Sequence, residues 1–389
     1  MATKILSVDD ELDLEVLLTQ YFRRQIRKGE YEFIFTHNGL EALQKMLETP
    51  DFDIILSDIN MPEMDGLTLL AKINELKNPA MKCIMVSAYG DMDNIRSAMN
   101  KGAFDFATKP IDLEDLERSI RKATEEIAFI RKSEKEHSQL ESIKNDLAIA
   151  GEIQRAILPL FPPFPELTKK VDLFATMVPA KDVGGDFYDL FQIDENRFGF
   201  VIADVSGKGI PASLFMAVSR TLLRATGLRD VSSTECINYV NKLLCKESLE
   251  AMFVTAFYGI YNCSNGIIDY TNAGHTPPYI IRHNGHVEVV EMETNFVMGI
   301  FDDFHYTGGG LVLENGDILV LYTDGVTEAF NPQKEQFSNS GLIRVLKTLP
   351  STTSEAKGLV EGIVESVYAH AGEQPQSDDI TLLVIKRMN

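Results

Sequence analysis

The sequence has no tryptophan, four cysteines, and no apolar run near the roughly 18 residues that a membrane helix needs. Its cysteines form no Cys-x-x-Cys pair, so the sequence predicts neither a zinc finger nor a disulfide framework. The first ten residues end in Asp9-Asp10 and contain no apolar stretch of the kind found in a secretory signal. Together these absences predict a cytoplasmic protein with reduced thiols and no membrane segment.

Positive charge is also scarce, because 37 Lys and Arg face 58 Asp and Glu, which gives a formal net charge of −21. A protein that binds the phosphate backbone of a nucleic acid needs a positive surface, so no nucleic-acid partner is expected. The 389 residues exceed one ordinary hydrophobic core and suit two globular domains joined by a connector.

Residues 1–120 alternate short buried strands with amphipathic helical stretches. This rhythm is typical of an α/β fold in which helices cover both faces of a parallel sheet. The strands are expected at Lys4–Val8, Glu32–Thr36, Phe52–Ser57, Lys82–Ser87 and Phe104–Thr108. Functional side chains in such a fold gather at the carboxyl ends of the strands.

Five polar side chains follow these strand ends in order. Asp9 and Asp10 end the first strand, Asp58 ends the third, and Ser87 and Lys109 end the fourth and fifth. Acids suit a hard divalent cation, a hydroxyl suits a phosphoryl oxygen, and lysine supplies a compact positive charge. One strand-end aspartate is often only a helix cap, but five such groups in order predict a phosphorylation site at Asp58.

With the segment LSDINMPEMDG at residues 56–66, this pattern resembles the receiver domain of bacterial response regulators over about residues 3–120. The resemblance implies a flavodoxin-like, doubly wound parallel sheet, a two-component system, and a sensor histidine kinase as partner. The implied residue roles are the phosphoacceptor Asp58, the Mg²⁺ ligands Asp9, Asp10 and Asp58, the switch pair Ser87 and Lys109, and the aromatic reporter Phe106.

Residues 121–160 are predicted to form a helical coiled-coil linker, in a helix that begins near Leu116. One apolar seam consists of Leu116, Ile120, Ala123, Ile127 and Ile130. A second consists of Leu140, Ile143, Leu147, Ala150 and Ile157, with Gln154 in its line. These steps of three and four are a heptad pattern, interrupted by the polar stretch Arg131–Gln139. Because an apolar stripe seldom stays alone in water, the pattern favours a parallel homodimer over a single solvated helix.

Residues 161–389 mix predicted strands with helices. The strands are expected at Phe198–Ala203, Phe253–Tyr261, Ile267–Thr271, Tyr279–Arg282, Ile318–Tyr322 and Ile380–Lys386. Helices are expected after Pro211 and at Thr234–Leu249, Gly341–Thr348 and Ser354–His370. The pair Asn265-Gly266 indicates a hairpin between two strands.

Four acidic clusters in this region lie beside glycines or strand ends. They are Gly184–Asp189, Ala203–Gly209, Thr323–Gly325 and Ser377–Thr381. Carboxylates at close range repel one another, so their gathering predicts a pair of divalent ions that activates one water. No arginine lies within the clusters, so the ions are expected to hold a phosphate largely unaided. Gly184–Phe187 looks like the GGDEF hairpin of diguanylate cyclases, but Phe stands in place of the required acid.

Together with EIQRAILP at residues 152–159 and NAGHTPP at 272–278, the clusters resemble PP2C-like phosphatases of the sporulation stage II and sigma-factor-regulator type. The resemblance covers about residues 148–388 and implies an α/β sandwich and a metal-dependent serine/threonine phosphatase with two Mn²⁺ or Mg²⁺ ions. It also implies a phosphorylated anti-sigma-factor antagonist as substrate. The implied metal ligands are Asp186, Asp204, the carbonyl of Val205, Asp324 and the pair Asp378 and Asp379, of which either is a candidate. His275 is expected to be a structural residue of a tight turn.

Two other classes of function compete with a phosphorylation-controlled phosphatase. A non-enzymatic adaptor would join a receiver to a decayed phosphatase fold, but all four acidic clusters are complete. A DNA-binding output is disfavoured by the acidic composition. The sequence therefore predicts a response regulator that controls a protein phosphatase, with the substrate protein and the sign of control left open.

Overall fold

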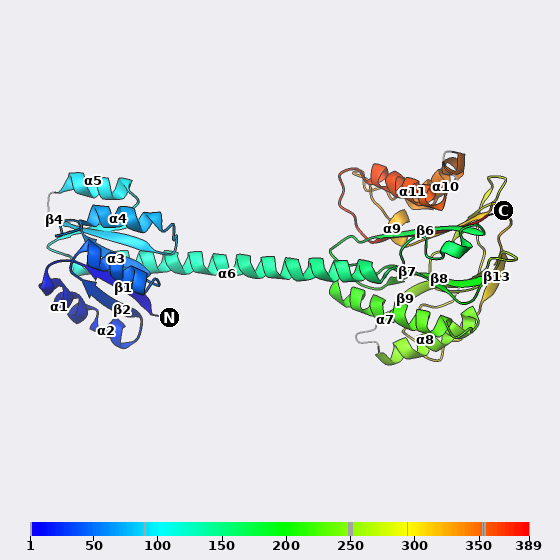
Figure 1. Cartoon of the computed structure of the whole chain (residues 1–389), viewed down its shortest axis with the longest axis horizontal. Coiled ribbons are helices and arrows are strands. Elements are labelled where there is room, and N and C mark those ends of the chain that lie inside the picture. The colour runs from blue at the N-terminus through cyan, green and yellow to red at the C-terminus, as the bar shows by residue number, and fades with distance from the viewer. Residues whose placement is uncertain are drawn as a thin grey trace. The chain divides into compact units, whose positions relative to one another are not determined.

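The computed structural model of the chain describes residues 2–88, 91–247, 252–293, 295–351, 353 and 355–388. Its contacts divide it into two compact units, residues 1–143 and residues 144–389 (Figure 1). In these described ranges, no helix combines the length and the apolar composition that crossing a membrane requires.

The first unit is a five-stranded parallel sheet with strand order β2-β1-β3-β4-β5. Helices α3 and α4 pack on one face, and α1 and the start of α6 pack on the other. This is the flavodoxin-like, doubly wound architecture that the sequence predicts. Its strands are β1 (Thr3–Val8), β2 (Tyr31–Thr36), β3 (Ile54–Asp58), β4 (Lys82–Ala88) and β5 (Asp105–Lys109). Its helices are α1 (Leu12–Tyr21), α2 (Arg23–Arg27), α3 (Gly39–Glu48), α4 (Gly66–Glu75), α5 (Met92–Asn100) and α6 (Leu113–Ile157).

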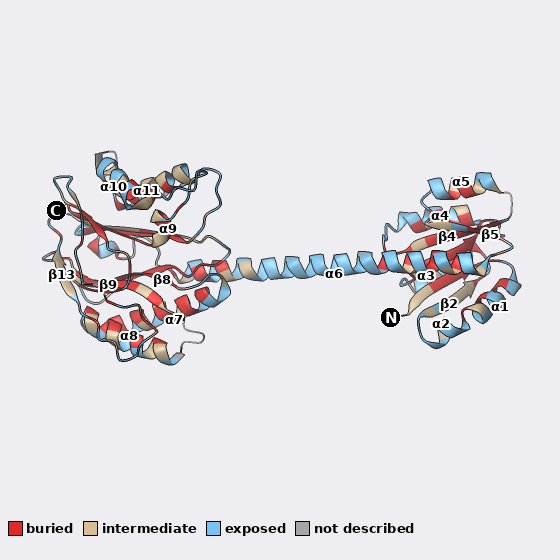
Figure 2. Cartoon of the chain, turned by 180° about the vertical axis from the view of Figure 1, so that it is seen from behind, coloured by how far each residue is buried: buried red, intermediate tan, exposed pale blue. Residues whose placement is uncertain are grey.

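The first of the two dimer seams predicted along helix α6 is wrong, because its residues are buried within the first unit. Four residues of the first seam are at most 3% exposed and belong to the hydrophobic core of the first unit: Leu116, Ile120, Ala123 and Ile127. These side chains already pack against the sheet and α1, so they are not available to a partner helix. The same apolar period suits a coiled coil and a helix lying on a sheet. Farther along α6, Leu140 and Ile143 are exposed, as Figure 2 shows for the middle of this helix.

The second unit stacks two antiparallel sheets, with helices outside each of them (Figure 1). The first sheet has the order β13-β10-β9-β8-β7 and is covered by α7 and α8. The second has the order β12-β11-β14-β15-β6 and is covered by α10 and α11. Large side chains from both sheets, such as Phe198 and Leu383, fill the core between them. The result is the α/β sandwich that the resemblance implies.

The strands of the second unit are β6 (Val171–Val178), β7 (Phe187–Gln192), β8 (Arg197–Val205), β9 (Val254–Asn262), β10 (Ile267–Ala273), β11 (Tyr279–Ile281), β12 (Val287–Val289), β13 (Gly309–Val312), β14 (Ile318–Tyr322) and β15 (Ile380–Arg387). The helices are α7 (Ile210–Gly227), α8 (Ser233–Glu247), α9 (Asp324–Thr327), α10 (Ser338–Thr348) and α11 (Ala356–Ala371), with short 3-10 turns at Pro165–Leu167 and Leu349–Ser351.

The six predicted strands and the hairpin at Asn265-Gly266 are confirmed. Strands β6, β7, β12 and β13 were not predicted. Strand β7 begins within the cluster Gly184–Asp189, whose acids interrupt the apolar pattern of a buried strand.

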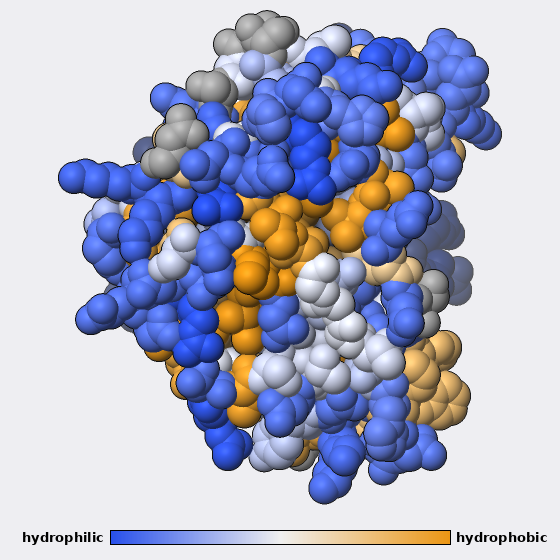
Figure 3. Space-filling view, turned by 90° about the vertical axis from the view of Figure 1, so that its right-hand side faces the viewer, coloured by the Kyte–Doolittle hydropathy of each residue, from blue (hydrophilic) through white to orange (hydrophobic). Residues whose placement is uncertain are grey.

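The surface of the sandwich is not uniformly polar. Figure 3 shows hydrophobic side chains gathered in the middle of one face, among hydrophilic ones. Two exposed apolar residues, Ile267 and Val312, are register partners on β10 and the edge strand β13. The edge of this sheet is therefore partly apolar.

Candidate functional site

The carboxyl ends of β1 and β3 bring three acids of the first unit together. Asp9, Asp10 and Asp58 each offer a carboxylate oxygen, and these oxygens lie within 4.8 Å of one another. Asp9 and Asp58 are buried, whereas Asp10 is exposed. Carboxylate oxygens at this spacing fit a hard divalent cation such as Mg²⁺.

Lys109, at the end of β5, reaches the same point. Its Nζ lies 2.7 Å from Asp58 Oδ2, 2.9 Å from Asp9 Oδ2 and 2.9 Å from Glu11 Oε1. Burial lowers the pKa of Lys109, but its hydrogen bonds with these three acids outweigh burial and raise the pKa overall. The lysine therefore stays charged beside the predicted phosphoacceptor. The strand-end pattern gives no signal for Glu11, because this acid follows the pair that ends β1.

Ser87 and Phe106 lie on the neighbouring strands. Ser87 is fully buried on β4, one residue beyond Val86, the register partner of Asp58. Its hydroxyl has no hydrogen-bond partner among the residues that the structure describes. A buried hydroxyl without a partner is costly, and a phosphoryl oxygen on Asp58 is a group that can satisfy it. Phe106 on β5 is 36% exposed, so its ring is not held in the core.

In the second unit, four distant segments of the chain bring their acids to one place. Asp186 precedes β7, Asp204 lies near the end of β8, Asp324 begins α9, and Asp378 lies just before β15. The carboxyls of Asp186 and Asp204 are within hydrogen-bonding reach of each other. Among the described residues of this unit, no three acids bring their oxygens as close together as the receiver acids do. Four carboxylates from these segments could together hold a pair of divalent ions.

Two threonine hydroxyls hold Asp186 in place. Thr323 Oγ1 and Thr381 Oγ1 each donate a hydrogen bond of 2.7 Å to Asp186 Oδ2. Both threonines are fully buried and adjoin the other acids along the chain. Both bonds go to the same carboxylate oxygen, so they fix the orientation of the Asp186 side chain. Sequence motifs gave these two threonines no role, because their partner lies 137 and 195 residues away.

The neighbours Asp378 and Asp379 have different surroundings. The carboxylate of Asp379 accepts hydrogen bonds from the backbone N–H groups of Ala180 at 2.8 Å and Gly185 at 2.7 Å. It therefore fixes the backbone beside Asp186. The side chain of Asp378 is 36% exposed and forms an ion pair with Lys208. This arrangement favours Asp378 as the metal ligand and Asp379 as a positioning residue.

Close backbone approaches explain the glycines beside the acids. A side chain at Gly185 would come within 2.9 Å of the carbonyl oxygen of Val205, the group predicted to assist the metal. A side chain at Gly325 would overlap the carbonyl oxygen of Asp379. Larger residues at either position would separate the clusters that must meet.

The gathered acids change one another's ionisation. Burial, followed by the negative charges of Asp324 and Asp378, raises the pKa of Asp204 to about 7. Burial, followed by the charges of Asp204 and Asp379, also raises the pKa of Asp186 well above its ordinary value. Acids that resist ionisation in this way are suited to a bound cation, which restores the charge balance.

Two residues from the predicted motifs lie outside this group of acids. Asp189 is fully buried on β7 and pairs with Arg220 at 3.1 Å and Arg224 at 2.7 Å, both on α7. His275 is buried, its Nδ1 lies 2.9 Å from Thr255 Oγ1, and burial lowers its pKa to about 4. A neutral, enclosed imidazole fits the structural role expected for this turn residue.

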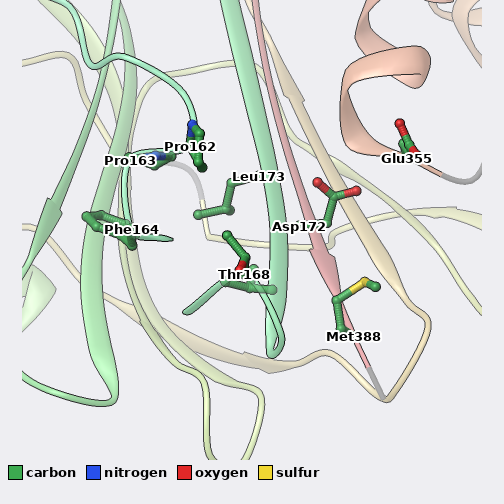
Figure 4. A pocket seen from close by; sticks show the side chains of 9 residues that line it. Pro162, Pro163, Phe164, Thr168, Asp172, Leu173, Glu355 and Met388 are labelled. Carbon is green, nitrogen blue, oxygen red and sulfur yellow. The ribbon is translucent and has the colours of Figure 1, made fainter. Parts of the chain in front are cut away.

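A cavity of about 250 Å³ lies apart from these acids, near the proline-rich segment that follows α6 (Figure 4). Asp172 in its wall accepts a hydrogen bond of 2.7 Å from the backbone N–H of Ala356, at the start of α11. This contact satisfies the beginning of a helix. The cavity is lined by Pro162, Pro163, Phe164, Thr168, Val171, Asp172, Leu173, Glu355 and Met388. None of the predicted site residues belongs to this lining.

The fold and the two groups of acids together define a response-regulator receiver joined to a PP2C-type serine/threonine phosphatase domain. Comparison with known proteins agrees in both parts. The model for the response regulator receiver domain matches residues 5–121, and the model for stage II sporulation protein E (SpoIIE) matches residues 194–388. The chain belongs to the SpoIIE family of phosphatases and carries a receiver domain at its N-terminal end.

Two curated relatives extend the match beyond the phosphatase domain. Protein IcfG of Synechocystis sp. is 31% identical over 269 residues, which are 62% of this chain and 41% of IcfG, so the match spans less than half of that relative. Phosphoserine phosphatase RsbU of Bacillus subtilis is 30% identical over 247 residues, 64% of this chain and 71% of RsbU. A solved structure, the SiaA-PP2C domain of Pseudomonas aeruginosa, aligns with a TM-score of 0.55 and 21% identity over 64% of this chain and 99% of that one. At that identity it shows the fold alone.

Proposed function

We propose that this chain is a response regulator in which phosphorylation of Asp58 controls the hydrolysis of phosphoserine or phosphothreonine in a partner protein. The observation that carries this proposal is the meeting of four acids from distant segments: Asp186, Asp204, Asp324 and Asp378. The name of RsbU, a phosphoserine phosphatase, supports phosphoserine as the substrate residue.

The proposed partners follow from the same resemblance. A sensor histidine kinase is the proposed phosphoryl donor for the receiver. A phosphorylated anti-sigma-factor antagonist is the proposed substrate of the phosphatase. The acidic composition is the reason for expecting protein partners rather than nucleic acid.

The proposed reaction forms a bond between a water oxygen and phosphorus and breaks the bond from phosphorus to the serine oxygen, which takes up a proton. Divalent ions bound at the site would supply positive charge to the phosphoryl oxygens and lower the pKa of water. The four acids of the chain would hold these ions, with the carbonyl of Val205 as a further oxygen ligand. Asp379 and the two threonines position Asp186 for that task.

The direct test of the proposed activity is phosphate release from a phosphoserine protein by the full chain. Release is expected with Mn²⁺ or Mg²⁺ and is expected to stop in excess chelator. If no phosphoserine or phosphothreonine substrate releases phosphate with either ion, the non-enzymatic adaptor becomes the better explanation.

Helix α6 is the proposed route from receiver to phosphatase. Its first part is built into the receiver core. In the second unit, Gln154 Nε2 donates to the carbonyl of Gly184 at 2.7 Å, and the Gly184 N–H donates to Gln154 Oε1 at 3.0 Å. Gly184 lies two residues before Asp186. A shift of this end of α6 would therefore move a proposed metal ligand, which gives phosphorylation a means of control.

The chain is also proposed to form a parallel homodimer through the later part of α6. Replacing Leu140 and Ile143 by lysine is expected to turn dimer into monomer, because both side chains are exposed and would meet their counterparts in the partner helix. Sedimentation measures the change. Ser138→Lys with Ser142→Lys adds the same charge at positions outside the seam and should leave the dimer intact. A wild-type chain that is monomeric at every concentration would contradict this proposal.

The raised pKa of Asp204 predicts opposite pH effects with and without metal. In the metal-free chain the folded state keeps a proton on Asp204 up to about pH 7, whereas the unfolded state loses it near pH 4. Folding therefore becomes less favourable as the pH rises through this range. Metal binding needs the ionised acid and becomes stronger over the same range.

The Mn²⁺-induced rise in melting temperature is therefore expected to be larger at pH 8 than at pH 6. Melting curves with Mn²⁺ and with chelator at both pH values measure this difference. Asp204→Asn is expected to reduce the pH dependence of the chelated protein. An Mn²⁺ effect of the same size at both pH values would contradict the proposed ligand role.

A further inference from the structure

We propose that Lys208 binds the phosphoryl group of the substrate, so that the phosphatase site contains a protein cation in addition to its ions. This inference rests on the proposed function and adds a residue to it. It differs from the expectation that the ions hold the phosphate largely unaided, which considered only arginine within the clusters.

The position of Lys208 is the first observation. Its Nζ lies 2.7 Å from Asp378 Oδ2 and donates to the carbonyl oxygen of Ser377 at 2.7 Å. These contacts join two acidic clusters that are 170 residues apart in the sequence. Among the residues that the structure describes, Lys208 is the one basic side chain that forms an ion pair with any of the four proposed ligand acids, and its partner is Asp378.

The freedom of this lysine is the second observation. It lies between Gly207 and Gly209, which have φ angles of +91° and +77°, in a region that favours glycine. Apart from the adjoining residues of the chain, no described atom lies within 4 Å of the position that a side chain at either glycine would occupy. The lysine side chain is itself 46% exposed. The ammonium group is therefore carried by an unobstructed segment at the edge of the site.

Competition for Asp378 links these two observations. In the protein alone, the ammonium group balances the charge of a carboxylate that is also a proposed metal ligand. A divalent cation attracts this carboxylate more strongly than an ammonium ion does, so metal loading leaves the lysine available to another anion. A phosphoryl group brought to the ions is the anion that arrives beside it.

In phosphoryl transfer, the ammonium group of Lys208 would stabilise negative charge on the phosphoryl group. Negative charge spreads over the non-bridging oxygens of the phosphoryl group, and groups fixed at those oxygens lower the barrier. Lysine binds phosphate as a point charge with three N–H donors. Lys208 also lies two residues before the start of α7, and the beginning of this 18-residue helix adds partial positive charge nearby.

The test compares the full-length wild-type chain with Lys208→Met, which keeps the length of the side chain and removes its charge. Calorimetry measures the binding of inorganic phosphate to the Mn²⁺-loaded chain, and electron paramagnetic resonance measures the binding of Mn²⁺ without phosphate. Lys208→Met is expected to bind phosphate roughly 10- to 100-fold more weakly, the value of a charge-assisted hydrogen bond. Its Mn²⁺ affinity is expected to be equal to that of the wild type or higher, because a competing cation has been removed.

Two further variants sharpen the comparison. Lys208→Arg keeps the positive charge and should lose less phosphate affinity than Lys208→Met. Lys242→Met removes another exposed lysine of the same domain, on α8, and should change neither measurement. Equal losses in Lys208→Met and Lys208→Arg, unchanged phosphate binding in Lys208→Met, or a large loss of Mn²⁺ affinity would each overturn the proposal.

The proposed function can fail independently of Lys208. If the wild-type chain hydrolyses no phosphoserine protein but its phosphate binding still depends on Lys208, the phosphate site stands and the enzymatic proposal falls. If phosphoserine is hydrolysed and Lys208→Met binds phosphate as the wild type does, the enzyme stands and the role of Lys208 falls.

Discussion

Replacing Asp204 by alanine is expected to lower phosphate release by the full chain more than about a hundredfold. Even residues that only support a metal ligand are worth roughly 10- to 100-fold in affinity or activity, and a ligand itself should be worth more. Asp204 is placed by β8 among the three other proposed ligand acids, so its loss removes one oxygen ligand from each proposed ion that it contacts. Steady-state assays with saturating Mn²⁺ measure the loss.

The Asp204→Ala variant is expected to keep the fold and the stability of the wild type. Removing one of several mutually repelling carboxylates is expected to leave the chelated chain as stable as the wild type or more stable. Melting curves in chelator therefore separate loss of a ligand from loss of structure. Asp302→Ala removes an exposed acid of the same domain and serves as the matched control. Wild-type turnover in Asp204→Ala would refute the proposed metal site.

Asp58→Asn is expected to abolish both the uptake of a phosphoryl group by the receiver and the response of the phosphatase to it. Asp58 is the acid that Lys109 contacts at 2.7 Å beside the proposed Mg²⁺ ligands. Ser87, whose hydroxyl has no partner in the described part of the chain, lies on the adjacent strand. Asparagine keeps the size of the side chain but is not a nucleophile for phosphoryl transfer. Unstimulated phosphate release should be unchanged.

Intact-protein mass spectrometry after treatment with a small phosphodonor measures this uptake. Asp93→Asn, which alters an exposed acid on α5, should be labelled as the wild type is. Equal labelling of Asp58→Asn and the wild type would place the acceptor elsewhere.

The receiver site could be predicted almost completely from sequence, because its residues directly follow the ends of predicted strands. Each strand of a parallel sheet ends at the same edge, so the acids after β1 and β3 and the lysine after β5 had to meet. What the pattern did not reveal was Glu11, which contributes to the charge around Lys109 without ending a strand. The strand pattern has no means of reporting where the side chain of a loop residue turns.

The phosphatase site could be predicted only in part, because its contacts are long-range. The four acidic clusters were visible, but the assignment of Asp378 and Asp379 depended on backbone N–H groups near residue 180. The buried pairing of Asp189 with two arginines on α7 also depends on the fold. Spacing along the chain carries no information about such partners.

Helix α6 shows a different limit of sequence analysis. The apolar steps at Leu116 and Ile120 fit a coiled-coil seam and a helix on a sheet equally well. Periodicity identifies the buried face of a helix but not the surface that covers it. The sheet of the receiver covers this face, and only the later, exposed apolar residues remain for a partner helix.

The most direct test of control by phosphorylation is phosphate release from a phosphoserine protein, measured with and without beryllofluoride as a phosphoryl mimic on the receiver. With Mn²⁺ present, beryllofluoride is expected to raise the rate of the wild-type chain and to have no effect on Asp58→Asn. Both rates are expected to fall to background in chelator. Phosphate release that persists without metal, or that is the same with and without beryllofluoride, would contradict a receiver-controlled, metal-dependent phosphatase.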